Sequence, residues 1–127
     1  MNPNTRELRA LLDSGAAELF QALYGSAVVS SILVLRSPSV AYYHSAGSTP
    51  RAMNVGASHF LVHNVAAVLQ AGGVHTFNLG GAPEASSLAR FKLGFGANVV
   101  LLSAATCFVG SSWKRKLRDA VAFIRSR

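Results

Sequence analysis

Apolar positions group into short strand-like runs in the first part of the chain. Three such runs, at residues 16–24, 27–36 and 40–45, are separated by the turn-forming stretches Tyr-Gly-Ser at 24–26 and Ser-Pro-Ser at 37–39. The pattern predicts three consecutive strands joined as a meander. The first run contains the good helix formers AELFQAL, so a helix is the alternative there, and we interpret it as a strand.

A helical pattern follows at residues 57–72, where apolar side chains recur at near-helical spacing and two glycines end the run. A shorter helix is expected before the meander, at 5–12 (TRELRALL). The remaining patterns predict, in order, a strand, a short helix, a long buried strand and a final helix with an apolar stripe: residues 74–79, 86–93, 98–109 and 112–127.

The composition fits one packed α/β (α+β) domain spanning residues 1–127. Half of the residues are hydrophobic, only 13% are charged, and the mean hydropathy is +0.33, which excludes a disordered chain. No apolar run reaches the roughly 20 residues of a spanning helix, so no membrane span is expected. The first residues lack a basic segment followed by an apolar one, so we expect a cytoplasmic protein.

The single cysteine and the uneven charge change this picture little. Cys107 cannot form an internal disulfide, and we interpret it as core filler. The formal charge is +7, and half of the 12 Lys and Arg residues lie near the C-terminus: Lys114, Arg115, Lys116, Arg118, Arg125 and Arg127. A basic helix attracts polyanions such as RNA or phosphates, although many charged runs are only solvated helix faces.

The loop expected at residues 47–56 joins a strand directly to the start of the 57–72 helix. The first N–H groups of that helix have no partner within it, so they form a site for an anion. Arg51 adds a fork of donors, and Asn54 and Gly56 are residue types that tolerate a left-handed backbone. An ordinary strand-to-helix loop is the alternative.

These features resemble the GNAT superfamily of acyltransferases, in which an Arg/Gln-x-x-Gly-x-Gly/Ala loop between a strand and a helix holds the pyrophosphate of coenzyme A. Arg51, Asn54 and Gly56 match this motif, with Asn54 in place of its first glycine. The resemblance implies that acyl-coenzyme A is the co-substrate, that no metal is needed, and that the phosphates are bound at the following residues: Arg51, Asn54, Val55, Gly56, Ala57 and Ser58.

The stretch FNLGGAPEASSLARFKLGFGA, at residues 77–97, is similar to the Fem-type branch of that superfamily. There a strand commonly ends in Asp-x-Gly-Gly, and the next helix carries Phe-Lys-x-x-Phe-Gly. Gly80 and Gly81 match the first motif, Asn78 departs from it at the acidic position, and the second motif is matched at 91–96. This resemblance implies that Gly80, Gly81 and Lys92 lie beside the donor, which is acyl-coenzyme A or an aminoacyl-tRNA.

The resemblance spans roughly residues 16–109. It implies a mixed, largely antiparallel sheet of about five strands with helices packed on it. The chain has only a short segment before the meander, so it looks like the C-terminal portion of such a domain, with the N-terminal part missing. An exposed sheet edge or face would favour self-association, and we therefore expect a homodimer.

Transfer of an acyl group to an amine requires the amine to lose a proton. Glu84, in the loop after Gly81, and His44 together with Tyr43 are the candidates for this step. Each has a simpler explanation: His44 as a hydrogen-bonded residue at a strand end, and Glu84 as a charge near a helix start. His63 is interpreted as a packing or surface residue.

A different class of function is also compatible with the sequence. The chain would then be a non-catalytic dimeric module whose basic C-terminal helix binds nucleic acid or another anionic partner. Attachment of the same helix to a membrane surface is a weaker version of this reading.

Overall fold

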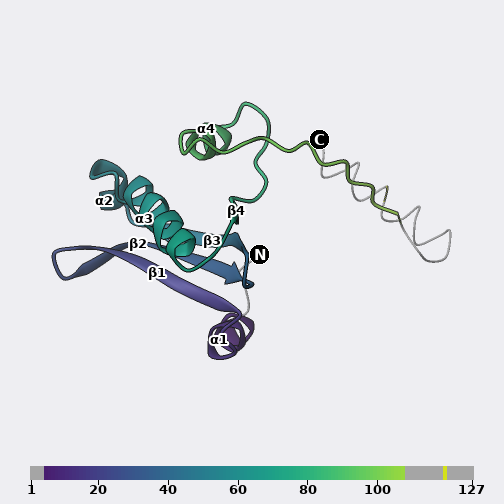
Figure 1. Cartoon of the computed structure of the whole chain (residues 1–127). Coiled ribbons are helices and arrows are strands. Elements are labelled where there is room, and N and C mark those ends of the chain that lie inside the picture. Colours follow the sequence, from purple (N-terminus) through teal and green to yellow (C-terminus); the bar gives the residue numbers. More distant parts are fainter. Residues whose placement is uncertain (1–4, 108–118, 120–127) are drawn as a thin grey trace.

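The computed structural model describes residues 5–107 and residue 119. Apart from the short helix α2, its helices and strands in this part follow the expected order (Figure 1): α1 Thr5–Asp13, β1 Ala17–Tyr24, β2 Ala27–Arg36, β3 Val40–Ser48, α2 Pro50–Asn54, α3 Ala57–Ala71, β4 Thr76–Asn78 and α4 Ser87–Leu93. Each helix here is too short or too polar to span a bilayer. The expected final helix and its basic residues lie outside the described residues.

The strands form one mixed sheet in the order β1-β2-β3-β4. The first three pair antiparallel, and β4 pairs parallel to β3. The ambiguous first run is therefore a strand, and the expected mixed, largely antiparallel architecture is confirmed. The chain reaches β4 through α3, since a parallel neighbour requires a crossover connection.

Helix α3 covers one face of the sheet (Figure 1). Its buried side chains recur at helical spacing, and the largest fully buried ones, Val65 and Leu69, pack in one cluster with Ile32 and Val34 of β2. Burying each such side chain contributes about 1.5–3 kcal/mol. This packing fixes where the start of α3 lies relative to the ends of β2 and β3.

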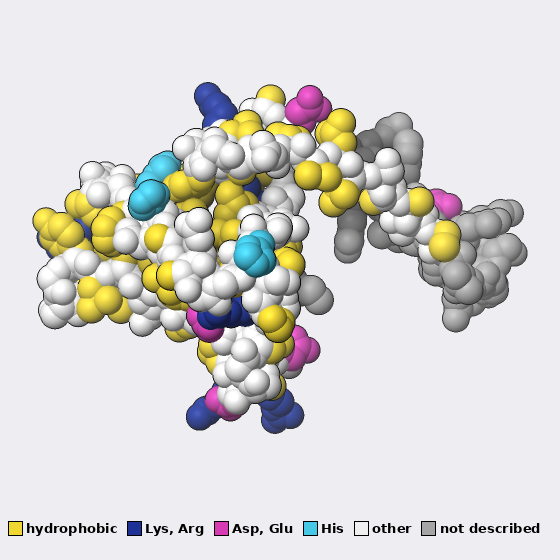
Figure 2. Space-filling view, in the orientation of Figure 1, with side chains coloured by type: hydrophobic (Ala, Val, Ile, Leu, Met, Phe, Trp, Pro, Cys, Tyr) yellow, Lys and Arg dark blue, Asp and Glu magenta, His cyan; other side chains and the backbone are white. Residues whose placement is uncertain are grey.

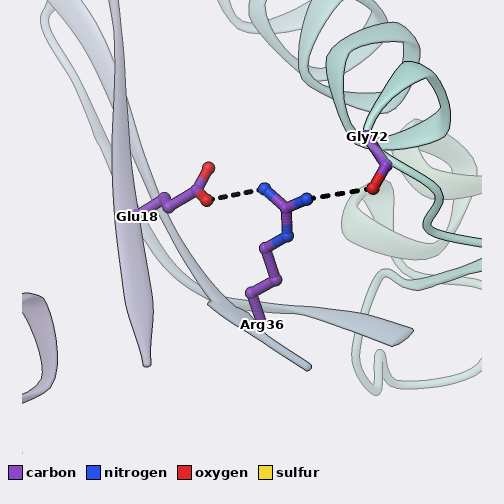
Figure 3. A network of polar contacts seen from close by, with 3 residues as sticks. All are labelled: Glu18, Arg36 and Gly72. Carbon is purple, nitrogen blue, oxygen red and sulfur yellow. Dashed lines mark hydrogen bonds and ion pairs between the residues drawn. The ribbon is translucent and has the colours of Figure 1, made fainter. Parts of the chain in front are cut away.

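A polar network holds the other end of α3 in place (Figure 3). The guanidinium of Arg36 donates from Nη1 to Glu18 Oε1 at 2.7 Å and from Nη2 to the carbonyl of Gly72 at 3.2 Å. Arg36 lies on β2, Glu18 on β1, and Gly72 caps α3. One side chain thus joins two strands to the helix C-terminus.

The prediction of a long buried strand at 98–109 is wrong for the part that the structure describes. Residues 98–107 have no regular structure, and the side chains of Val99, Val100, Leu101 and Leu102 are 70–93% exposed. A strand needs a neighbouring ladder, and the described chain places none beside this segment. The described sheet therefore has four strands rather than about five. Cys107 is exposed as well, so its interpretation as core filler is wrong.

The loop expected at 47–56 is shorter than anticipated. Strand β3 continues to Ser48, and Thr49 then caps α2, with its hydroxyl accepting from the N–H of Ala52 at 3.3 Å. Pro50 occupies the first turn of α2, where the missing N–H is harmless. Pairing a Thr cap with Pro is a helix-start signal that the loop reading overlooked.

Candidate active site

Strands β3 and β4 separate after a short stretch of pairing. They pair only from Val40↔Thr76 to Tyr42↔Asn78, and β3 then continues to Ser48 without a described strand on that side. The side chain of Asn78 explains the end of β4: its Oδ1 accepts from the N–H of Gly80 at 2.8 Å, which turns the chain away from the sheet. The edge of β3 is left open between the two diverging segments.

A β-bulge lies on this open part of β3. The register with β2 moves from Leu33↔Ser45 to Val34↔Tyr43, so His44 has no residue opposite it. The imidazole of His44 is exposed, and its Nδ1 lies 3.2 Å from Ser45 Oγ. A bulge leaves backbone groups outside the ladder, so they are available to a ligand entering at this edge.

Gly80 lies in close contact with β3 and α4. A Cβ atom at this position would stand 3.5 Å from Tyr42 Oη, 3.6 Å from Lys92 Nζ and 3.6 Å from the carbonyl oxygen of Tyr43. The φ angle of Gly80 is +75°, which favours glycine. Tyr42 therefore lies at the candidate site, although the sequence analysis did not name it as a candidate. Strand alternation could not choose between the two tyrosines, since neighbouring residues point to opposite faces.

Lys92 of α4 holds the turn after β4. Its Nζ donates to the carbonyl of Gly81 at 2.8 Å and lies 5.9 Å from the centre of the Tyr43 ring. Partial burial lowers the pKa of Lys92 and raises the pKa of the Tyr43 phenol. Both shifts have the same cause, because burial disfavours the charged form of each group.

The start of α3 offers free backbone amides. Gly56, with φ +67°, precedes the helix without a side-chain cap, and the N–H groups of Gly56, Ala57, Ser58 and His59 have no acceptor among the described residues. The N–H of Val55 differs, since it donates to the carbonyl of Arg51 at 3.3 Å. Free amides at the positive end of a long helix form an anion site.

Three serine hydroxyls tie this helix start to the sheet. Ser48 Oγ lies 2.9 Å from both Ser30 Oγ and Ser58 Oγ, and Ser30 Oγ is 3.5 Å from Ser58 Oγ. Ser30 is only 2% exposed, and these hydroxyls are its partners. The sequence gives no sign of this cluster, because its members come from three separate elements.

Arg51 and Asn54 both lie on α2 and are exposed. The guanidinium of Arg51 lies over the ring of Tyr24, 4.4 Å from its centroid. This cation–π contact holds α2 against the end of β1. Arg51 stays exposed to solvent in this position.

An aromatic cluster connects the start of α3 to α4. The ring centroid of His59 is 4.6 Å from that of Phe91 and 5.6 Å from that of Phe95, and the two phenylalanines are 5.1 Å apart. The cluster brings the helix of Lys92 to the same side of the sheet as the free amides. His59 was not a candidate in the sequence analysis, because a single sequence does not show that residue 59 contacts residues 91 and 95.

The side chains of Glu84 and His63 contribute no described hydrogen bond to these groups. Glu84 is exposed in the turn before α4, and no described residue donates a hydrogen bond to its carboxylate. His63 lies one turn further along α3 and lines a hollow with Phe77 and Phe95. In the part of the chain that the structure describes, no three His, Cys, Asp or Glu side chains gather as a metal site.

One family model matches the chain. A family model described as the acetyltransferase (GNAT) domain matches residues 4–93. A curated-protein comparison finds no match.

Solved structures share the fold at low sequence identity. A possible acetyltransferase from Clostridium difficile 630 superposes with a TM-score of 0.69 at 13% identity, covering 84% of this chain and 76% of that one. A ribosomal-protein-alanine N-acetyltransferase from Brucella melitensis biovar Abortus 2308 gives 0.63 at 16% identity, covering 85% and 82%. AAC(6')-Iy, solved with a bisubstrate analog of coenzyme A, gives 0.62 at 14% identity, covering 84% and 82%.

Proposed function

The chain belongs to the acetyltransferase (GNAT) domain family, whose model matches well over half of its residues, and on that premise we propose that it transfers an acyl group from acyl-coenzyme A to an amine. The observation that carries the proposal is the pairing of free amides at the start of α3 with the open edge of β3. The free amides bind the phosphates of the donor, and the open edge of β3 receives its acyl end.

The donor phosphates bind at the amides of residues 56–59. Four N–H groups without a described acceptor lie there at the positive end of α3, and Arg51 on the preceding helix α2 is an exposed cation. Asn54 ends α2 next to this turn. The N–H of Val55 donates to the carbonyl of Arg51 at the end of α2, so it is not free for a phosphate. Val55 contributes only by linking α2 to the free amides.

The acyl end of the donor lies along β3, near the bulge at His44 and the turn at Gly80 and Gly81. The N–H of Gly80 already donates to Asn78, so the carbonyl of the thioester is polarised by backbone groups of the bulge instead. Lys92 stabilises the turn at Gly80 and Gly81 by donating a hydrogen bond to the Gly81 carbonyl.

In the reaction, the amine nitrogen of the acceptor attacks the thioester carbonyl, the C–S bond breaks, and coenzyme A leaves as the thiolate or thiol. The amine proton passes to a base or relayed water. Tyr43, His44 and Glu84 stay candidates for this step, and the hydroxyl of Tyr42 beside Gly80 joins them. Such a phenol can return a proton to the leaving sulfur.

A substitution at the helix start tests the phosphate site. Gly56→Asp places a carboxylate beside the free amides, in open space and in a left-handed conformation that Asp tolerates. Repulsion and competition for the amides should weaken coenzyme A binding about tenfold, or about 1.4 kcal/mol. Calorimetric titration measures this.

The matched control is Gly56→Asn, which has the same shape and backbone strain without the charge. It should bind coenzyme A nearly as the unsubstituted protein does. Equal affinity of the Asp and Asn variants would contradict a phosphate site at these amides. Release of free thiol from acetyl-coenzyme A in the presence of amine acceptors reports the transfer itself.

The Fem-type branch, an aminoacyl-tRNA donor and a homodimer remain predictions, as does the reading of the chain as the C-terminal portion of a domain. The non-catalytic alternative, nucleic-acid binding by the basic C-terminal helix, concerns residues outside the described part. Anisotropy of labelled RNA at two salt concentrations tests it, because binding to phosphates weakens steeply with salt. RNA binding without coenzyme A binding would favour that alternative.

A further inference from the structure

Residues 98–102, called here the apolar arm, form a highly exposed apolar segment of the described chain. Its side chains Val99, Val100, Leu101 and Leu102 are exposed by 70%, 74%, 93% and 86%. Figure 2 shows hydrophobic side chains along the chain that leads away from the body. A contiguous exposed run of this kind marks an interaction surface. Its residues favour a strand, but no described ladder pairs with it.

The same chain has an apolar trough between α3, β4 and the turn after α4. A hollow of about 350 Å³ there shares Ala66 and Phe77 with a neighbouring hollow of about 500 Å³, so the two adjoin. Most of the lining is apolar, although His63, Gln70 and His75 also contribute. The apolar lining includes Val62, Ala66, Leu69, Val74, Phe77 and Leu79.

The position of β4 makes the trough suitable for a strand. β4 is the last strand in the described sheet order, so its outer edge has no described neighbour. An unpaired edge accepts an added strand through backbone hydrogen bonds. Phe77 belongs to β4 and lines both hollows, so the edge and the trough form one surface.

The arm begins at the trough but runs away from it. Gly96 and Ala97 line one end of the trough, and the chain beyond them extends outward (Figure 1). One molecule therefore presents both an uncovered arm and an open trough. A second copy has the complement of each, and a two-fold arrangement satisfies both at once.

We propose that the apolar arm of one copy adds as a strand beside β4 of a second copy, with one row of its side chains in the trough. The arm contains no charged residue, so the chain's positive charge does not oppose the contact locally, and it offers nothing to a polyanion. This proposal gives the expected homodimer a specific contact, and it does not depend on acyl transfer.

Light scattering after size exclusion tests the arm. The unsubstituted protein should have the mass of a dimer, and the double variant Val100→Asp/Leu101→Asp the mass of a monomer. The two positions cover both rows of an extended segment, whichever faces the trough. Because both side chains are exposed in the single chain, the variant should stay folded, and its far-ultraviolet circular dichroism should change by no more than the strand contribution of the arm. Leu23→Asp, at a 61% exposed position on β1, is the matched control and should stay dimeric.

Mixing separates exchange between copies from other contacts. Ala66→Glu fills the trough and should also give a monomer. An equimolar mixture of the arm variant and the trough variant should recover heterodimer, since one intact arm then meets one intact trough. The proposal is overturned by an unsubstituted protein that is monomeric at all concentrations, by a dimeric arm variant, or by a mixture that stays monomeric.

Coenzyme A titration of the same preparations keeps the two claims apart. The arm variant should bind coenzyme A as the unsubstituted protein does, because the arm lies outside the residues assigned to the phosphates. An arm variant that is monomeric and still binds coenzyme A supports the arm contact. This result does not depend on whether the protein catalyses acyl transfer. Absence of coenzyme A binding in every preparation, with the predicted masses observed, removes only the proposed function.

Discussion

Individual residues decide where the chain departs from regular structure beside the site. Asn78 ends β4 through its bond to the Gly80 N–H, and Gly80 then takes a left-handed conformation against Tyr42 and Lys92. The departure of Asn78 from the acidic residue of the Fem-type pattern is compatible with this turn. A carboxylate or an amide oxygen accepts the same hydrogen bond.

Gly80 and Gly81 differ in a way that can be measured. Gly80→Ala should destabilise the fold by about 1–2 kcal/mol, because a side chain is strained at positive φ. Gly81→Ala is the control, since that position has no positive φ and a Cβ there meets nothing within 4 Å. Urea unfolding measures both, and equal stability of the two variants would show that the turn does not need a left-handed residue.

At the scale of elements, α3 is positioned from both ends. The serine cluster joins its first turn to β2 and β3, and Arg36 joins its last carbonyl to β1 and β2. The free amides at its start therefore belong to a helix that the sheet holds firmly. A site built on such a helix needs little rearrangement to bind an anion.

Arg36→Met tests this attachment. The substitution keeps an unbranched chain but loses the bonds to Glu18 and Gly72, and unfolding free energy should fall by about 1 kcal/mol, a modest figure because the pair is partly exposed to solvent. Arg9→Met is the comparison. Its pair with Asp13 is 3.9 Å long and largely exposed, so thermal unfolding should barely change. A larger loss at Arg9 would contradict the role given to Arg36.

The elements up to α4 could be predicted from the sequence because their signals are local. The turns at 24–26 and 37–39 separate the meander strands, and the apolar spacing of α3 is helical over its whole length. The segment at 98–107 has an equally apolar sequence, yet a strand forms only beside a partner. Apolar composition cannot reveal whether that partner belongs to the same chain.

The site was predictable in part for the same reason. The free amides at 56–58 follow from a helix start, which is a local feature. The aromatic cluster of His59 with Phe91, the serine cluster and the contact of Tyr42 with Gly80 each join distant parts of the sequence. Such contacts depend on the packing of elements, which a single sequence does not show.

At the scale of the whole molecule, the two proposals depend on two surfaces. One is the start of α3 with the open edge of β3, which fits an anionic donor, and the other is the apolar arm with its trough. They share α3 and α4 as supports. Both surfaces need only the described residues, so neither depends on the basic residues near the C-terminus.

The most direct measurement is a titration of ¹⁵N-labelled protein with coenzyme A, followed through the backbone amide signals. We predict saturable shifts concentrated at Gly56, Ala57, Ser58 and His59, with smaller ones at the bulge of β3. Gly56→Asp should suppress these shifts, while Gly56→Asn should not. Saturable binding that leaves these four amides unmoved, or no binding at all, would contradict the phosphate site on which the acyltransferase proposal rests.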